Sequence, residues 1–144
     1  MATEPAAATR HHARIVWEGD KEDLRAHRAE LAGQVLLASS MPERGGNPDR
    51  ADPEEMFVAA LSGCHMLWFL HLARERRLRV TSYADDAVGD LDGERITRVE
   101  LRPRVSFESD PGAEVLAELH HGAHERCFLA ASVNFPVEVV SGDE

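Results

Sequence analysis

The sequence predicts an α+β fold, built from short strands, one long apolar helix and a second, shorter helix. The long helix is predicted from a nearly uninterrupted apolar segment, 53–77, which opens on strong helix-start residues. Two strand-like segments, 78–88 and 96–108, flank the turn sequence DLDGE at 90–94, and this arrangement indicates a β-hairpin. Further strand-like segments lie towards both ends of the chain, so the coarse order is strands, helix, strand pair, helix and strand.

The N-terminal third is predicted to form strands after a flexible tail of residues 1–10. Segment 12–18 mixes apolar and polar positions in the manner of a first strand. Segment 24–31 fits a strand or a helix, whereas 34–39 indicates a strand that begins after the break at Gly33. A loop is predicted for the next segment, which reads MPERGGNPDRADP and is rich in Gly and Pro.

The start of the long helix is marked by capping residues. Asp52 is a favourable N-cap, and Pro53 suits the first helical position. Glu55 stands three residues after Asp52, as a capping box requires. Apolar side chains then surround the helix on nearly all sides to about Arg77, which predicts burial on most of its faces.

The C-terminal third contains the second helix and a last strand. Asp110 is predicted to cap this helix and Pro111 to take its first position. Its apolar side is supplied by Val115, Leu116, Leu119, Ala123 and Ala130. Cys127 is therefore expected on the helix, and segment 135–140 is expected to be a short strand. Pro103 is expected to mark an edge or a bulge in the preceding strand.

The composition describes one acidic domain. The chain has 144 residues, long enough to bury a core, and a formal net charge of −10. This charge argues against nucleic acid as a partner, because neutralising phosphates requires clustered Lys and Arg. The sequence opens without the pattern of a secretory signal. Segment 56–73 has about the minimum length of a membrane span. Ser62, His65 and His71 interrupt it, so we expect a core helix in a cytoplasmic protein with no membrane association.

The two cysteines are the first candidates for chemistry. Cys64 lies in the middle of the apolar helix, where a small buried thiol is ordinary, and Cys127 permits the same interpretation. A reactive role would need positive charge near the thiolate and a second thiol to resolve a sulfenic acid into a disulfide. Arg44 and Arg50 in the preceding loop could supply the charge, and Glu54 could hold a guanidinium in place. The residues alone leave both interpretations open.

One stretch of the sequence, NPDRADPEEMFVAALSGC, resembles the signature of the OsmC/Ohr family of thiol-dependent hydroperoxide reductases, in its OsmC-like branch. The hairpin sequence DLDGERITRVELRPRVSF and the segment AHERCFLAASV are similar to further parts of that family. Order and spacing match from about residue 17 to about residue 140, which implies a single OsmC-like domain at residues 11–144. The resemblance implies antiparallel sheets with two main helices in an intertwined homodimer.

The resemblance also implies a function and the residues that perform it. Cys64 matches the cysteine that attacks the peroxide, Cys127 matches the resolving cysteine, and Glu54 matches the catalytic glutamate. Arg44 takes the place of the active-site arginine, with Arg50 as a rival because this loop varies in length. The implied activity is reduction of organic or inorganic hydroperoxides with electrons from a dithiol reductant, in defence against oxidative or osmotic stress. It needs no metal or bound cofactor.

Helix geometry adds a constraint on the glutamate. Glu54 and Cys64 stand ten residues apart, which is about 15 Å along a helix axis. A glutamate side chain cannot bridge that distance within its own helix. We therefore expect that Glu54 serves a site completed by the partner chain, or that its loop folds back over the cysteine.

Two rival functions remain. His120, His121 and His124 cluster close to Cys127 and could ligate a metal. His65, which follows the first cysteine, is expected to be a core histidine or a proton donor to that cysteine. The other rival is a non-enzymatic protein of the same fold that binds a small apolar ligand in a pocket at its interface.

Overall fold

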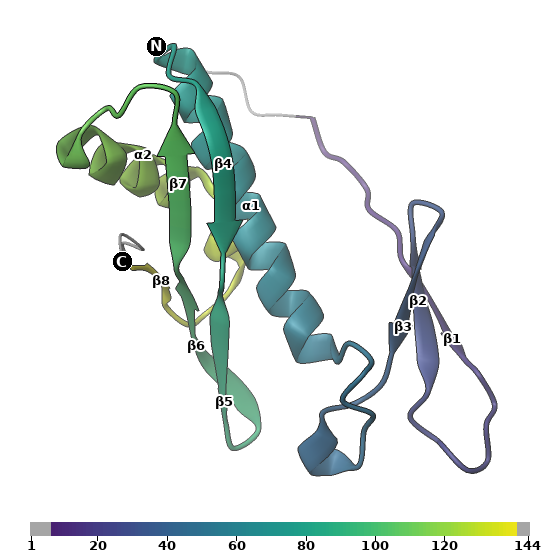
Figure 1. The fold of residues 1–144 in the computed structure, drawn as a ribbon. Coiled ribbons are helices and arrows are strands. Elements are labelled where there is room, and N and C mark those ends of the chain that lie inside the picture. The colour runs from purple at the N-terminus through teal and green to yellow at the C-terminus, as the bar shows by residue number, and fades with distance from the viewer. Residues whose placement is uncertain (1–6, 141–144) are drawn as a thin grey trace. The chain divides into compact units, whose positions relative to one another are not determined.

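The computed structural model describes residues 7–140, shown in Figure 1. Residues 1–6 of the predicted tail therefore lie outside the described residues, and residues 7–10 are exposed and belong to no strand or helix. The chain divides into two compact units, one up to Pro53 and one from Glu54 onward. The single domain over residues 11–144 stays a prediction.

The N-terminal unit contains a three-stranded antiparallel sheet with the order β1-β2-β3. Its strands are β1 (Arg14–Trp17), β2 (His27–Leu31) and β3 (Gln34–Ala38). Segment 24–31, which the sequence left open as a strand or a helix, is thus a strand from His27 onward. β2 and β3 are joined by Ala32 and Gly33, with φ of 51° and 79°. Left-handed backbone at both positions is the geometry of a tight hairpin turn, which confirms the predicted break at Gly33.

The predicted loop follows β3 and folds back on it. A short 3-10 helix covers Pro42–Arg44, and the chain then returns so that Ala51 pairs with Ala38. The return is tight at Gly46, where a Cβ atom would lie 1.6 Å from the backbone oxygen of Ser40. Only glycine can occupy that position without moving the backbone.

The long helix α1 (Pro53–Glu75) begins directly after Asp52, as the capping residues predicted. Its buried residues recur every four positions and form a single stripe: Leu61, His65, Phe69 and Ala73. Burial on most faces was therefore not observed in the single chain. Leu67, on another face, is 64% exposed, and Phe57 is 40% exposed. The apolar sequence of α1 thus provides more apolar surface than this chain covers.

The predicted hairpin is present, but each of its strands is divided in two. β4 (Val80–Asp85) pairs with β7 (Pro103–Phe107), and β5 (Val88–Asp92) pairs with β6 (Arg95–Leu101), all antiparallel. The interruption lies at Arg102, whose backbone N–H donates to the Asp85 carboxylate at 2.6 Å. A side chain thus replaces a backbone acceptor there, next to the predicted irregularity at Pro103.

The last strand, β8 (Val137–Val139), is shorter than predicted and runs parallel to β6. The second helix, α2 (Ala113–Arg126), begins two residues after its predicted start at Pro111. Asp110 accepts from the backbone N–H of Gly112 at 2.8 Å, so it closes a local turn instead of capping the helix. α2 ends at Arg126, and a second 3-10 helix follows at Ala130–Ser132.

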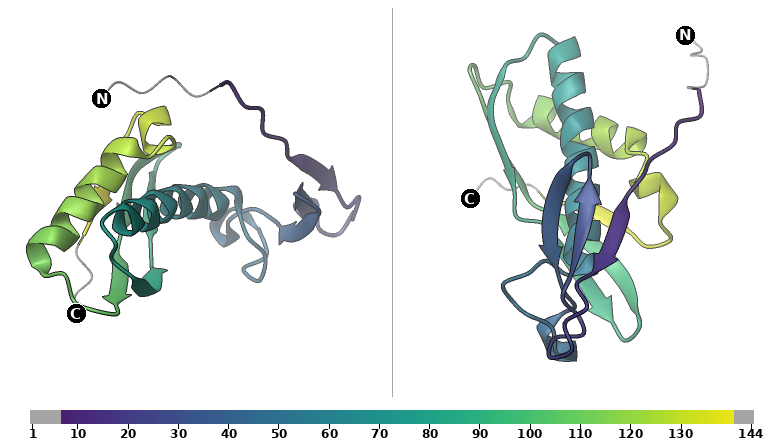
Figure 2. Two further views of the ribbon diagram at one scale, coloured as in Figure 1. Left: turned by 90° about the horizontal axis from the view of Figure 1, so that it is seen from above. Right: turned by 90° about the vertical axis from the view of Figure 1, so that its right-hand side faces the viewer.

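The C-terminal unit has a core in which both helices pack against the sheet (Figures 1 and 2). α1 contributes to two buried clusters along its length. The first consists of Leu61, Val99, Leu101 and Val137. The second consists of Phe69, Ala73, Leu119 and Ala123 and joins α1 to α2. The C-terminal part of α1 is therefore held against the middle and the C-terminal part of α2.

Candidate active site

The structure brings the two cysteines of the chain together. Cys64 lies in the middle of α1 and is partly exposed, and Cys127 is buried directly after the last residue of α2. Cys64 lies near enough to Cys127 to raise the pKa of its thiol, and both cysteines are free thiols. Cys127 is not on the helix, which corrects the sequence prediction. It is the C-cap residue, with extended backbone at φ −68° and ψ 113°.

The environment of Cys127 favours its protonated form. Burial raises the pKa of the Cys127 thiol, and the neighbouring Cys64 thiol raises it further. The backbone N–H of Ala130, 3.5 Å from the sulfur, opposes this shift only partly. At neutral pH, Cys127 is therefore a thiol, and the more accessible Cys64 is the cysteine that a reagent in solution can meet.

An apolar pocket lies between α1 and the segment that follows α2. It has a volume of about 280 Å³ and is lined by Leu67, Trp68, His71 and Phe128. Trp68 stands four residues after Cys64 on α1, and Phe128 directly follows Cys127. The Trp68 and Phe128 rings meet edge to face with centroids 5.6 Å apart. The Arg126 guanidinium lies over this indole, 5.0 Å from the ring centroid. Sequence reasoning missed this aromatic pair, because only the fold brings positions 68 and 128 together.

A pair of histidines forms a second contact between the helices. His65 is 1% exposed, and its Nε2 lies 3.0 Å from Nδ1 of His120, with the two rings 9° from coplanar. His65 is therefore a core histidine with a hydrogen-bond partner, which is one of the two interpretations that the sequence left open. Burial lowers the pKa of both imidazoles to about 4. The charges of His120 and His124 lower the pKa of His65 further, whereas Asp85 opposes the shift at His120. The two rings are thus neutral at physiological pH.

The predicted histidine cluster is not gathered around one point. His120 is bonded to His65, and His121 is exposed and contacts Glu125 at 3.0 Å. Within residues 7–140, no group of three or more His, Cys, Asp or Glu side chains is arranged to hold a metal ion. The geometry gives the metal-binding rival no support.

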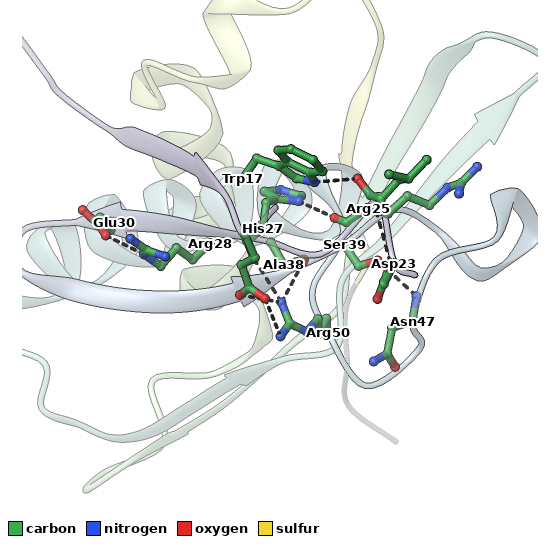
Figure 3. Close-up of polar contacts among 12 residues, drawn as sticks. Trp17, Asp23, Arg25, His27, Arg28, Glu30, Ala38, Ser39, Asn47 and Arg50 are labelled. Atoms are coloured by element: carbon green, nitrogen blue, oxygen red, sulfur yellow. Dashed lines mark hydrogen bonds and ion pairs between the residues drawn. The ribbon is translucent and has the colours of Figure 1, made fainter. Parts of the chain in front are cut away.

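The two candidate arginines differ in what they already bind. Arg50 makes a two-point ion pair with Glu18, at 3.1 and 3.3 Å. It also donates to the carbonyls of His27 and Ala38, as Figure 3 shows. Its guanidinium therefore holds the loop to its own sheet. Arg44, at the end of the 3-10 helix, is exposed and makes no ion pair with any residue in the range 7–140.

Glu54 lies in the first turn of α1 and is partly buried. Cys64 follows on the same unbroken helix, about 15 Å further along its axis. Since Glu54 is held within the helix, it is not on a loop that could fold back. Within this chain its carboxylate cannot reach the thiols.

Comparison with known proteins identifies the family. The family model described as OsmC-like protein matches residues 46–141, more than half of the chain. The chain belongs to the OsmC-like family. This confirms the resemblance found in the sequence and agrees with the two helices and antiparallel sheets of the fold.

Solved structures of the family resemble the chain over most of its length. An OsmC-like protein of unknown function from Vibrio cholerae is 39% identical, with a TM-score of 0.86, covering 93% of this chain and 99% of that one. The organic hydroperoxide resistance protein OsmC from Legionella pneumophila is 17% identical, with a TM-score of 0.71 over 94% and 97%. An organic hydroperoxide resistance protein from Elizabethkingia anophelis is 19% identical, with a TM-score of 0.67 over 94% and 96%. No curated protein matches this chain.

Proposed function

We propose that this OsmC-like protein is a thiol-dependent peroxidase that reduces organic or inorganic hydroperoxides. The observation that carries the proposal is the pair of neighbouring free thiols, one partly exposed and one buried. Such a pair suits a reaction in which the exposed sulfur is oxidised first and the buried sulfur then closes a disulfide. The organic hydroperoxide resistance proteins from Legionella and Elizabethkingia share the fold and are consistent with this proposal.

The reaction proceeds in three balanced steps. The Cys64 thiolate attacks the outer oxygen of the hydroperoxide, the O–O bond breaks, and the other oxygen leaves as an alcohol or water after taking a proton. Cys64 is then a sulfenic acid. The Cys127 thiol condenses with it, forming an S–S bond and releasing water. A dithiol reductant returns both cysteines to thiols and becomes a disulfide itself.

The apolar pocket supports organic hydroperoxides as the preferred substrates. Its lining by Leu67, Trp68 and Phe128 gives an alkyl or aryl tail a place to leave water. Neither cysteine lines it, and a tail would reach it from Cys64, which stands about one helical turn before Trp68 on α1. Hydrogen peroxide has no such tail and would gain nothing from the pocket. We place the reaction in the cytoplasm, where reducing conditions keep both cysteines as thiols. α1 is long and apolar enough to span a membrane, but core helices of soluble proteins share that composition.

We further propose that the active form is a homodimer in which Arg44 and Glu54 complete the site. One face of the N-terminal sheet carries exposed apolar side chains in register, and a second copy of the chain would cover them. They are Ile15, Trp17, Leu31 and Leu36. Glu54 cannot reach Cys64 of its own helix, so its carboxylate would serve the partner's thiols. Arg44 would stabilise the thiolate, with Glu54 orienting its guanidinium.

Consumption of hydroperoxide in the presence of a dithiol tests the activity. Wild-type protein with dithiothreitol is expected to consume cumene hydroperoxide catalytically and faster than hydrogen peroxide. Cys64→Ser is expected to lose this activity, because it lacks the attacking sulfur. Consumption by wild type no faster than by Cys64→Ser would contradict the proposal.

A second candidate function is non-enzymatic binding of a small apolar ligand, which one observation favours. A cavity of about 770 Å³ lies between α2 and the strands, with apolar residues Val105, Phe107, Leu116, Val137 and Val139 in its lining. His120, His121 and His124 also line it. Neither cysteine lines it. Binding of an apolar fluorescent probe by Cys64→Ser as tightly as by wild type, without any peroxidase activity in wild type, would favour this candidate.

A further inference from the structure

Two side-chain contacts fix the same helices to each other. One joins Cys64 to Cys127, and the other joins His65 to His120. On α1 the two contacts come from consecutive residues. On the C-terminal side of the pair, His120 lies on α2 and Cys127 is the C-cap residue directly after its last residue. The position of α2 across α1 therefore determines both contacts together.

The histidine contact differs in kind from its surroundings. Apolar contacts between α1 and α2, such as the close approach of Leu72 to Gly122, tolerate small sliding movements because they have no preferred direction. The hydrogen bond between His65 and His120 does not tolerate such sliding, because it depends on distance and direction. It is 3.0 Å long, and the two ring planes differ by 9°. Phe69 packs on His120 with ring centroids 4.5 Å apart, so a ring that lost its partner would leave a polar atom in an apolar setting.

We propose that the His65–His120 hydrogen bond positions α2 over α1 and thereby sets the effective concentration of the Cys127 thiol at Cys64. Neither imidazole touches the hydroperoxide, so both are positioning residues. The consequence for catalysis rests on the proposed peroxidase function. Formation of the S–S bond requires a separation near 2 Å and a narrow dihedral range, so closure is sensitive to the register of the helices. Attack of Cys64 on a peroxide does not require this register.

The structure offers matched variants of His120. His120→Phe keeps a ring of similar size and its packing on Phe69, but removes the Nδ1 atom that bonds His65. His120→Asn loses the ring but keeps a polar atom near the position of Nδ1. His121→Phe makes the same chemical change at the next residue, whose ring is exposed.

The test is the equilibrium between the dithiol and the Cys64–Cys127 disulfide in glutathione redox buffers, read by thiol trapping and mass spectrometry. It needs no hydroperoxide. His120→Phe is expected to lower the effective concentration about tenfold. His120→Asn should restore most of it, and His121→Phe should leave it unchanged. The proposal would be overturned if folded His120→Phe had the same effective concentration as wild type. It would also be overturned if His121→Phe lowered the effective concentration equally.

If His120→Phe does not fold, the double variant His65→Phe/His120→Phe replaces both polar rings and leaves no buried unpaired nitrogen. Its effective concentration is also expected to fall, and a wild-type value would overturn the proposal. The outcome is independent of the peroxidase test. If glutathione closes the disulfide in a histidine-dependent manner while cumene hydroperoxide oxidises neither cysteine, the peroxidase function fails and the positioning role stands.

Discussion

The division of labour between the two cysteines follows from their surroundings. Cys127 is buried, and burial raises its pKa, so it is a poor first nucleophile. Once Cys64 is oxidised, the same burial is an advantage, because the Cys127 thiol is already in contact with the sulfur it must attack. The sequence could suggest both cysteines, but only the fold distinguishes the accessible one from the buried one.

The two arginines give a prediction at the scale of single residues. Arg50→Gln is expected to lower the free energy of unfolding by about 2 kcal/mol, because it breaks the bonds to Glu18 and two backbone carbonyls. Arg44→Gln is expected to slow oxidation of Cys64 about tenfold or more by removing the cation proposed for the thiolate. Urea unfolding and stopped-flow oxidation measure the two effects. If Arg50→Gln slowed oxidation of Cys64 and Arg44→Gln did not, Arg50 would be the active-site arginine in place of Arg44.

Among the elements, local signals predicted the start of α1 but not that of α2. Pro53 is the first residue of α1, whereas Pro111 looks the same in sequence and lies before α2, because Gly112 takes a φ of 90°. The long strands of the hairpin were predicted without their interruption. That interruption depends on Asp85 and Arg102, which are 17 residues apart, and a contact of this kind has no local signature.

The helix–helix contact predicts how stability depends on pH. Burial lowers the folded-state pKa of His65 from 6.5 to about 4. Between these values the unfolded chain binds more protons than the folded one, so stability falls as the pH drops from about 6.5 to about 4. The loss for this imidazole is on the order of 3 kcal/mol. Burial lowers the pKa of His120 as well, so this ring adds to the loss of stability, while Asp85 on β4 opposes that shift. His124 on α2 lowers the pKa of His65 further.

Urea unfolding at a series of pH values measures this dependence. His65→Phe/His120→Phe is the control, because it removes both titrating rings, and its stability should fall less over the same pH range. Parallel pH profiles for wild type and the double variant would contradict the account of the buried pair.

At the scale of the whole molecule, the exposed apolar faces and the position of Glu54 lead to the same proposal. The prediction is that wild type is a dimer and that Ile15→Glu, which places a carboxylate on the uncovered sheet face, shifts it to monomer and lowers peroxidase activity. Lys21→Glu adds a carboxylate at an exposed loop position and should change neither property. Sedimentation velocity and peroxide consumption test both variants. A monomeric wild type with full activity would exclude a site shared between chains.

Much of the candidate site was accessible from the sequence, because the segment 47–64 carries a recognisable signature. The histidine pair was not, since 55 residues separate His65 from His120 and their contact depends on how α2 packs on α1. The spacing of His120, His121 and His124 suggested a metal site because the sequence likewise does not show how α2 packs on α1. Neighbouring histidines on one helix point to different partners, and one of those partners belongs to another helix.

The most direct test of the central claim is a thiol count before and after one equivalent of cumene hydroperoxide. Wild type is expected to lose both thiols to one intrachain disulfide between Cys64 and Cys127. Cys127→Ser should lose its remaining thiol to a sulfenic acid, and Cys64→Ser should keep its own. If wild type retains both thiols for many minutes, or if Cys64→Ser is oxidised as fast as wild type, the redox pair described here does not reduce hydroperoxides.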